Sequence, residues 1–110
     1  MSPIRLTQAT ALILQALAIG RRHGFQIMEL TGLPSGTVYP VLRRLERELA
    51  VESEWEAGQV ASDAGRRTRR VYRLTESGQL LAERARQRLV DTQRLLASSG
   101  LGGANPSGVS

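Results

Sequence analysis

The residues best suited to chemistry in this chain are its arginines, which gather in one short stretch. Between Arg66 and Arg73 there are five arginines in eight residues and no acidic residue. All fifteen basic residues are arginine, so ten remain elsewhere, where they face ten aspartates and glutamates. A guanidinium is always charged and donates hydrogen bonds in a planar fork that suits phosphate. The local excess therefore predicts a surface that binds a polyanion, although a merely solvated charged face is the plainer alternative.

Other chemistries have little support in the sequence. Cysteine is absent, which excludes disulfides and thiolate metal sites, and His23 is the single histidine. No nucleophile–base pair, metal-ligand set or phosphate-cradling glycine loop has a defensible spacing. We therefore expect no enzymatic activity, no cofactor and no metal. His23 is expected to be a polar surface residue between two helices, with pH sensing as the less favoured alternative.

The length of the chain limits its architecture. A chain of 110 residues allows one small domain with a tail, and chains this short often gain stability by oligomerising. The longest apolar run, at residues 9–19, is interrupted by polar residues and is too short to span a bilayer. No cleavage site of a signal peptide follows it. We therefore expect a cytoplasmic, nucleoid-associated protein without membrane contact.

Three helices are predicted before the basic stretch. Periodicity and capping signals indicate a first helix from Thr7 to Gly20, a second over Gly24 to Leu30, and a third that begins with Ser35 as its N-cap. Apolar residues of the third helix fall on one stripe: Val38, Val41, Leu42, Leu45 and Leu49. The opposite face carries Gly36, Pro40, Arg43, Arg44 and Arg47. Pro40 removes a backbone donor, so we expect its first turn to be distorted.

After the third helix the apolar period changes to two, which predicts a β-hairpin. Val51, Ser53 and Trp55 alternate with three glutamates, as in a half-buried strand. Residues 58–65 have the composition of a hairpin tip, and residues 69–74 form the return strand. We expect Trp55 in the core at the hairpin base, and arginines paired with the glutamates across the ladder. Of the arginines, Arg66, Arg67 and Arg69 lie nearest to the tip and are the first candidates for other partners.

A long last helix is predicted from residue 75 to about residue 99. Its apolar positions form one narrow seam: Leu81, Ala85, Leu89, Thr92 and Leu96. So small a domain offers little for this seam to cover, so pairing with the same helix of a second copy is the expected solution. The alternative is that the seam packs on the first helix of its own chain. Residues 100–110, rich in glycine and serine, are expected to be a disordered tail.

The order helix, helix, helix, β-hairpin, helix is that of a winged helix-turn-helix. The expected fold class is α+β and mainly α: a winged helix-turn-helix of three helices and a two-stranded wing over residues 1–74, and a long C-terminal dimerisation helix over residues 75–99. In this fold the third helix enters the major groove of DNA, and the wing follows phosphates or the adjacent minor groove. The expected DNA contacts are Ser35, Thr37, Tyr39, Arg43, Arg44, Arg47, Arg66, Arg67 and Arg69. Arg43 is the candidate for reading a base, because a guanidinium can bond both acceptors of guanine.

Three motifs resemble those of the PadR family of bacterial transcriptional regulators. Residues 36–46 (GTVYPVLRRLE) are similar to the signature of its recognition helix, residues 24–27 (GFQI) to the opening of its second helix, and residues 70–78 (RVYRLTESG) to its wing exit. The resemblance covers residues 7–98 and implies a homodimeric repressor of a palindromic operator, as in short members with one C-terminal helix. Tyr39 resembles a family position that meets the DNA backbone. Family and architecture also imply release by a small-molecule effector, but the last helix has no aromatic residue to stack on a flat ligand.

A second function of a different class stays open. In this alternative the chain is a protein-interaction module: a winged helix that binds a partner protein and binds DNA weakly and without sequence preference. This alternative predicts DNA binding that disappears at moderate salt, because only phosphate contacts would support it.

Overall fold

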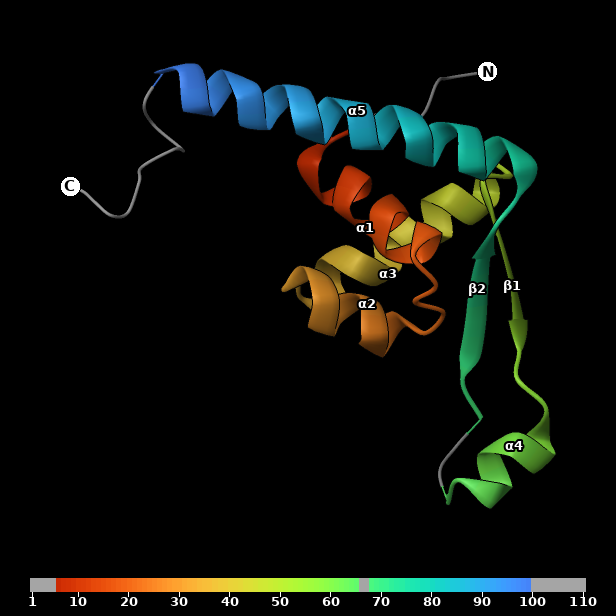
Figure 1. The fold of residues 1–110 in the computed structure, drawn as a ribbon. Coiled ribbons are helices and arrows are strands. Elements are labelled where there is room, and N and C mark those ends of the chain that lie inside the picture. Colours follow the sequence, from red (N-terminus) through yellow and green to blue (C-terminus); the bar gives the residue numbers. More distant parts are fainter. Residues whose placement is uncertain (1–5, 66–67, 100–110) are drawn as a thin grey trace.

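The computed structural model describes residues 6–65 and 68–99, without the side chains of residues 59–61. The elements are α1 (Gln8–Ala18), α2 (Gly24–Thr31), α3 (Ser35–Arg47), β1 (Val51–Trp55), α4 (Gly58–Asp63), β2 (Arg70–Leu74) and α5 (Glu76–Ser99). Arg66, Arg67 and the predicted tail at residues 100–110 lie outside the described residues. In Figure 1, α1, α2 and α3 form a cluster, the hairpin descends beside it, and α5 lies across the top and extends beyond the cluster.

The predicted winged helix-turn-helix is confirmed, and most helix ends fall where the sequence signals place them. Thr7 caps α1, because its Oγ1 accepts a hydrogen bond of 3.1 Å from the backbone N–H of Thr10. Gly32 ends α2 in the left-handed conformation, with φ 76°. The prediction for Ser35 is wrong, since Pro34 occupies the N-cap position of α3 and no side chain caps this helix. Pro40 lies inside a helix that continues to Arg47.

The hydrophobic core lies between α1, α2, α3 and the first half of α5. Residues from all of these elements are completely buried: Ile13, Leu14, Ile27, Val38, Leu42, Leu45 and Ala85. The predicted stripe of α3 is thus confirmed for its central members. Leu49 is a correction, because α3 ends before it and the side chain is 74% exposed. No helix among the described residues is long and apolar enough to cross a membrane.

Leu49 holds a backbone conformation that suits glycine. Its φ is 65°, and the exposed side chain has no packing to offset the strain of the left-handed region. The turn that ends α3 contains hydrogen bonds from the Ala50 N–H to the Leu45 carbonyl (2.9 Å) and from the Leu49 N–H to the Glu46 carbonyl (3.0 Å). We therefore expect Leu49→Gly to raise the free energy of unfolding by about 0.5–1 kcal/mol, measured by urea denaturation. A loss of stability would contradict this interpretation.

The hairpin has the predicted strands but a different tip. Strands β1 and β2 are antiparallel, with Val51 opposite Leu74 and Trp55 opposite Arg70. The outer edge of β2 is joined to the α1–α2 loop, because the backbone N–H of Tyr72 donates to the carbonyl of Arg22 at 2.8 Å. The tip is not a plain loop but contains the short helix α4. The segment was expected to be a loop because its residues are small and polar. It also contains glutamine and alanine, which are good helix formers.

Candidate nucleic-acid interface

The front of α3 carries an exposed set of polar and basic side chains. Its back is fixed in the core by completely buried Val38, Leu42 and Leu45. The opposite face therefore turns to solvent, with Ser35, Tyr39, Arg43 and Arg47 exposed and Thr37 half-buried. Within residues 6–65 and 68–99, no ion pair involves Arg43 or Arg47. Two uncompensated guanidiniums one helical turn apart can bond to an external anion without first leaving an internal partner.

Arg44 is directed away from this face. Its Nη2 donates a hydrogen bond of 2.9 Å to Oγ1 of Thr10, which is completely buried in α1. Its Nε is also buried and has no hydrogen-bond partner among the described groups. The side chain therefore connects α3 to α1 and does not belong to the exposed basic face of α3. Arg44 follows Val41 by three positions, which places it at the edge of the apolar stripe. This spacing could have predicted that the side chain turns toward the core and not toward solvent.

Tyr39 lies directly against the start of α2. A Cβ built on Gly24 would meet the hydroxyl and ring carbons of Tyr39, so the ring occupies the space that any larger residue would need. Gly24 is buried, whereas Tyr39 remains 36% exposed. The absence of a side chain at Gly24 thus leaves room for the Tyr39 ring between α2 and the front of α3.

We expect Gly24→Ala to displace Tyr39 and to weaken DNA binding. The added methyl group forces the ring to rotate away from α2, and a lost hydrogen bond to phosphate costs about 1 kcal/mol, or roughly fivefold in affinity. The measurement is the dissociation constant for operator DNA, with Gly58→Ala as control because a Cβ there meets nothing within 4 Å. Wild-type affinity of the Gly24→Ala variant would exclude a contact by Tyr39.

The described arginines of the wing pair with acids. Arg73 lies 3.0 Å from Glu52 and 3.5 Å from Glu54, which confirms the expected pairs across the ladder. Arg69 lies nearer to the tip but is not free. Its backbone N–H donates to Oε1 of Glu56 at 2.9 Å, and its Nε lies 3.9 Å from the same oxygen. Charge on this part of the wing is therefore largely compensated, so the free cations of the described residues at this face belong to α3.

The prediction that His23 is a surface residue is wrong. Its side chain is only 16% exposed, because the ring turns toward the hairpin and brings Nε2 to 3.9 Å from Glu56. Nδ1 lies 3.2 Å from Oε1 of Gln26, which also accepts the backbone N–H of His23 at 3.1 Å. Near these groups, burial raises the pKa of the Tyr72 phenol, and Arg70 opposes the shift. Tyr72 therefore keeps its proton at physiological pH.

The prediction for Trp55 is also wrong, because this residue is not in the core. Trp55 is the last residue of β1 and is 62% exposed. The guanidinium carbon of Arg70 lies 5.2 Å from the ring centroid, within the range of a cation–π interaction. Alternation along the strand predicts the face on which Trp55 lies but not how far the helices extend beneath that face.

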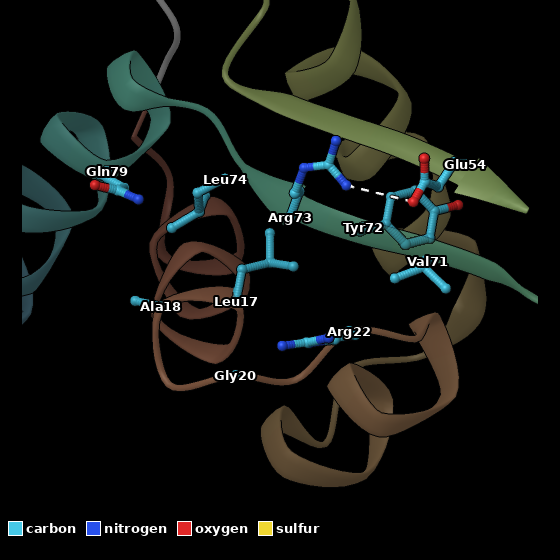
Figure 2. A pocket seen from close by; sticks show the side chains of 10 residues that line it. All are labelled: Leu17, Ala18, Gly20, Arg22, Glu54, Val71, Tyr72, Arg73, Leu74 and Gln79. Atoms are coloured by element: carbon cyan, nitrogen blue, oxygen red, sulfur yellow. Dashed lines mark ion pairs between the residues drawn. The ribbon is translucent and has the colours of Figure 1, made fainter. Parts of the chain in front are cut away.

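A pocket of about 460 Å³ lies between the end of α1, the wing and the start of α5 (Figure 2). One wall is apolar and is formed by Leu17, Ala18, Val71 and Leu74. The polar lining comes from Arg22, Glu54, Arg73 and Gln79, together with the edges of Gly20 and Tyr72. Arg73 is paired with Glu54, whereas the guanidinium of Arg22 reaches beneath Leu17 and has no ion pair within the described part of the chain.

The first half of α5 packs within its own chain. Leu81, Ala82 and Ala85 are buried, and Nε2 of Gln15 in α1 donates to the carbonyl of Ala82 at 2.7 Å. Leu81 and Ala85 therefore present no surface to a second copy, and for them the alternative of packing on the first helix is confirmed. These residues pack inside the chain because α1 offers an apolar face to α5. The apolar period of α5 alone could not show which helix covers it.

The second half of α5 leaves its apolar residues partly uncovered. Leu89 and Thr92 are half-buried, while Leu96 is 40% and Leu95 68% exposed. In Figure 1 this end of α5 projects beyond the cluster of helices. The seam that begins in the core thus continues onto a surface that its own chain does not cover.

Three helices, a two-stranded wing and an exposed basic face on the third helix define a winged helix-turn-helix protein. Residues 13–84 match the family model described as "Transcriptional regulator PadR-like family". The chain therefore belongs to the PadR-like family of transcriptional regulators, as its three motifs predicted. A comparison with curated protein sequences found no match.

Solved structures of bacterial regulators share the fold. A PadR family transcription regulator from Clostridium difficile is 22% identical, with a TM-score of 0.69 over 84% of this chain and 97% of that chain. PcaV from Streptomyces coelicolor, solved with its natural ligand, is 23% identical, with a TM-score of 0.67 over 84% of this chain and 62% of that chain. BpsR from Bordetella bronchiseptica, whose DNA binding is regulated by 6-hydroxynicotinic acid, is 23% identical, with a TM-score of 0.66 over 94% and 66%.

Proposed function

We propose that this protein is a homodimeric transcriptional repressor that binds a palindromic operator. The observation that carries the proposal is the exposed face of α3, where Arg43 and Arg47 have no acidic partner among the described residues and buried residues fix the back of the helix. A rigid helix with an uncompensated basic front suits insertion into the major groove. Membership of the PadR-like family supports the same role.

Contacts of two kinds follow from this arrangement. Arg43 reads a base, because its guanidinium can bond both acceptors of guanine in the major groove. Phosphate contacts come from the remaining proposed residues: Ser35, Thr37, Tyr39, Arg47, Arg66, Arg67 and Arg69. Arg69 must first weaken its interaction with Glu56, so we expect it to contribute less than Arg47. These contacts supply affinity and fix the register of the protein on the duplex.

We propose that a second copy covers the projecting half of α5. The contact residues are Leu89, Thr92 and Leu96 from the predicted seam, joined by the exposed Leu95. Such a contact is isologous, so it relates two recognition helices by a two-fold axis. Each operator half-site then lies about 10 base pairs, or a multiple, from its mate.

We also propose control by a small organic acid bound in the pocket of Figure 2. An apolar wall beside the unpaired Arg22 suits a carboxylate with a hydrophobic body. The regulation of BpsR by an aromatic acid supports this ligand class. We expect 6-hydroxynicotinic acid, used as a probe, to weaken operator binding by the wild type more than by Arg22→Gln. Equal effects on both proteins, or none on either, would contradict an effector site here.

The repressor proposal is tested by titrating the protein against DNA from the region upstream of its own gene. Random duplex serves as competitor, and the titration is done at two salt concentrations. We expect one tight site with about a thousandfold or greater preference over random duplex. Equal affinity for every duplex, with a steep loss as salt rises, would favour the alternative of a protein-interaction module.

A further inference from the structure

A chain of side-chain contacts joins the recognition helix to the wing. Oγ of Ser53 in β1 donates a hydrogen bond of 2.7 Å to Oε2 of Glu46 in α3. Nε of Arg70 in β2 donates to the same Ser53 oxygen at 3.0 Å, and its Nη2 lies 3.7 Å from Glu46 Oε2. We call Glu46, Ser53 and Arg70 the wing anchor. It connects α3 to both strands of the hairpin.

Trp55 holds the arginine of the wing anchor in place. The indole lies opposite Arg70 in the strand register, and the guanidinium carbon is 5.2 Å from the ring centroid. One face of the guanidinium is thus against an aromatic ring, while its nitrogens meet Ser53 and Glu46. Only arginine combines a flat cation with several donors, so a lysine could not make this set of contacts. The arrangement explains why a large indole is placed on an exposed strand end.

Glu46 stands in an unfavourable place for an acid. It lies in the sequence between Arg43 and Arg47 on the helix that is proposed to enter DNA, where a carboxylate repels phosphate. Its side chain is 36% exposed and that of Arg70 39% exposed, so the ion pair adds little to stability. The contact of Glu46 with the wing is therefore better explained by a role in positioning the wing relative to α3 than by a contribution to the free energy of folding.

We propose that the wing anchor fixes the angle between α3 and the wing, and that Glu46 is a positioning residue for operator binding in spite of its negative charge. This inference rests on the proposed function. Two elements that must enter neighbouring grooves together need a defined separation, since a misaligned wing loses its contacts while the helix stays bound. The wing anchor is a direct side-chain connection between these two elements.

Removing the charge of Glu46 distinguishes the two effects of this residue. If Glu46 only repels phosphate, operator binding becomes tighter; if Glu46 positions the wing, operator binding becomes weaker. For Glu46→Gln we expect binding to the operator to weaken about three- to tenfold, while binding to random duplex stays equal or becomes tighter. Glu48→Gln is the matched control, because Glu48 ends the same helix and makes no side-chain bond within the described residues. It removes the same charge and should not weaken operator binding. Operator binding by Glu46→Gln that equals or exceeds wild type would overturn the proposal.

A second pair of variants keeps the charge constant. Arg70→Lys should weaken operator binding with an unchanged salt slope, whereas Arg84→Lys should leave it unaltered, because Arg84 is exposed on α5 and makes no ion pair within the described residues. A decrease of the salt slope in Arg70→Lys would instead show that Arg70 contacts phosphate, and would overturn a positioning role.

The wing anchor can also be measured without DNA, because Trp55 is the single tryptophan. We expect Glu46→Gln and Arg70→Lys to lower the fluorescence anisotropy of the indole in the free protein, and Arg84→Lys to leave it unchanged. Unchanged anisotropy in all variants would overturn the proposal. If the wild type shows no preferred DNA site, the repressor function fails, and this fluorescence result still decides whether the wing anchor holds the wing.

Discussion

The Gly78→Ala variant is expected to lose about 3 kcal/mol of its unfolding free energy. A Cβ at this position would meet the carbonyl oxygen and carbon of Ala50, which are backbone atoms and cannot rotate aside as a side chain can. The same carbonyl accepts a hydrogen bond of 3.0 Å from the Thr75 N–H. Oγ1 of Thr75 in turn accepts the N–H of Gly78 at 3.1 Å and donates to the Leu49 carbonyl at 2.7 Å. The start of α5 therefore lies so close to Ala50, which follows α3, that no space remains for one additional methyl group.

Urea denaturation followed by circular dichroism measures this loss. Gly36→Ala is the matched control, since a Cβ there meets nothing within 4 Å and alanine is the better helix former. The control should gain up to about 1 kcal/mol. Wild-type stability of Gly78→Ala would show that α5 does not lie against Ala50 in solution.

Arg43→Ala is expected to cause the largest loss of specific DNA binding. Removing a bidentate contact to guanine costs about 1–3 kcal/mol, which corresponds to roughly fivefold to more than a hundredfold in affinity. Arg43 is exposed, unpaired within the described residues and remote from the core, so the fold should not change. The loss should appear on the operator and be much smaller on random duplex.

Arg47→Ala is the comparison that separates recognition of a base from electrostatic attraction to phosphate. Arg47 follows one turn later on the same face, and a phosphate contact there predicts a loss on every duplex and a decrease of the salt slope by about 0.9. Competition titrations over a range of salt measure both quantities. If Arg43→Ala and Arg47→Ala lower operator and random-duplex binding alike, neither arginine reads sequence.

Local signals predicted the elements of the fold well. Thr7 and Gly32 mark helix ends through side-chain capping and left-handed backbone geometry, which depend on a few neighbouring residues. The change of apolar period from 3.6 to two located the hairpin, and the pairs of Arg73 with Glu52 and Glu54 followed from the strand register. The basic front of α3 followed from the same periodicity.

Tertiary placement was beyond these signals. Trp55 has the alternation of a buried residue, but it is 62% exposed at the end of its strand. Leu81 and Ala85 lie in a seam that suits a second helix, and the period of the seam cannot tell α1 of the same chain from α5 of another. Arg44 and His23 bury polar groups against Thr10 and Glu56, which are distant in sequence. Each error concerns which surface covers a residue, and not which element contains it.

In the proposed complex, two copies of α3 bind successive turns of one DNA duplex. Footprinting of the major groove on the operator, combined with the mass of the complex, tests this arrangement most directly. We predict two protected blocks whose centres lie about 10 base pairs, or a multiple, apart, and a complex of two protein chains per duplex. A single protected block with one chain bound, or uniform protection along the DNA, would contradict the account.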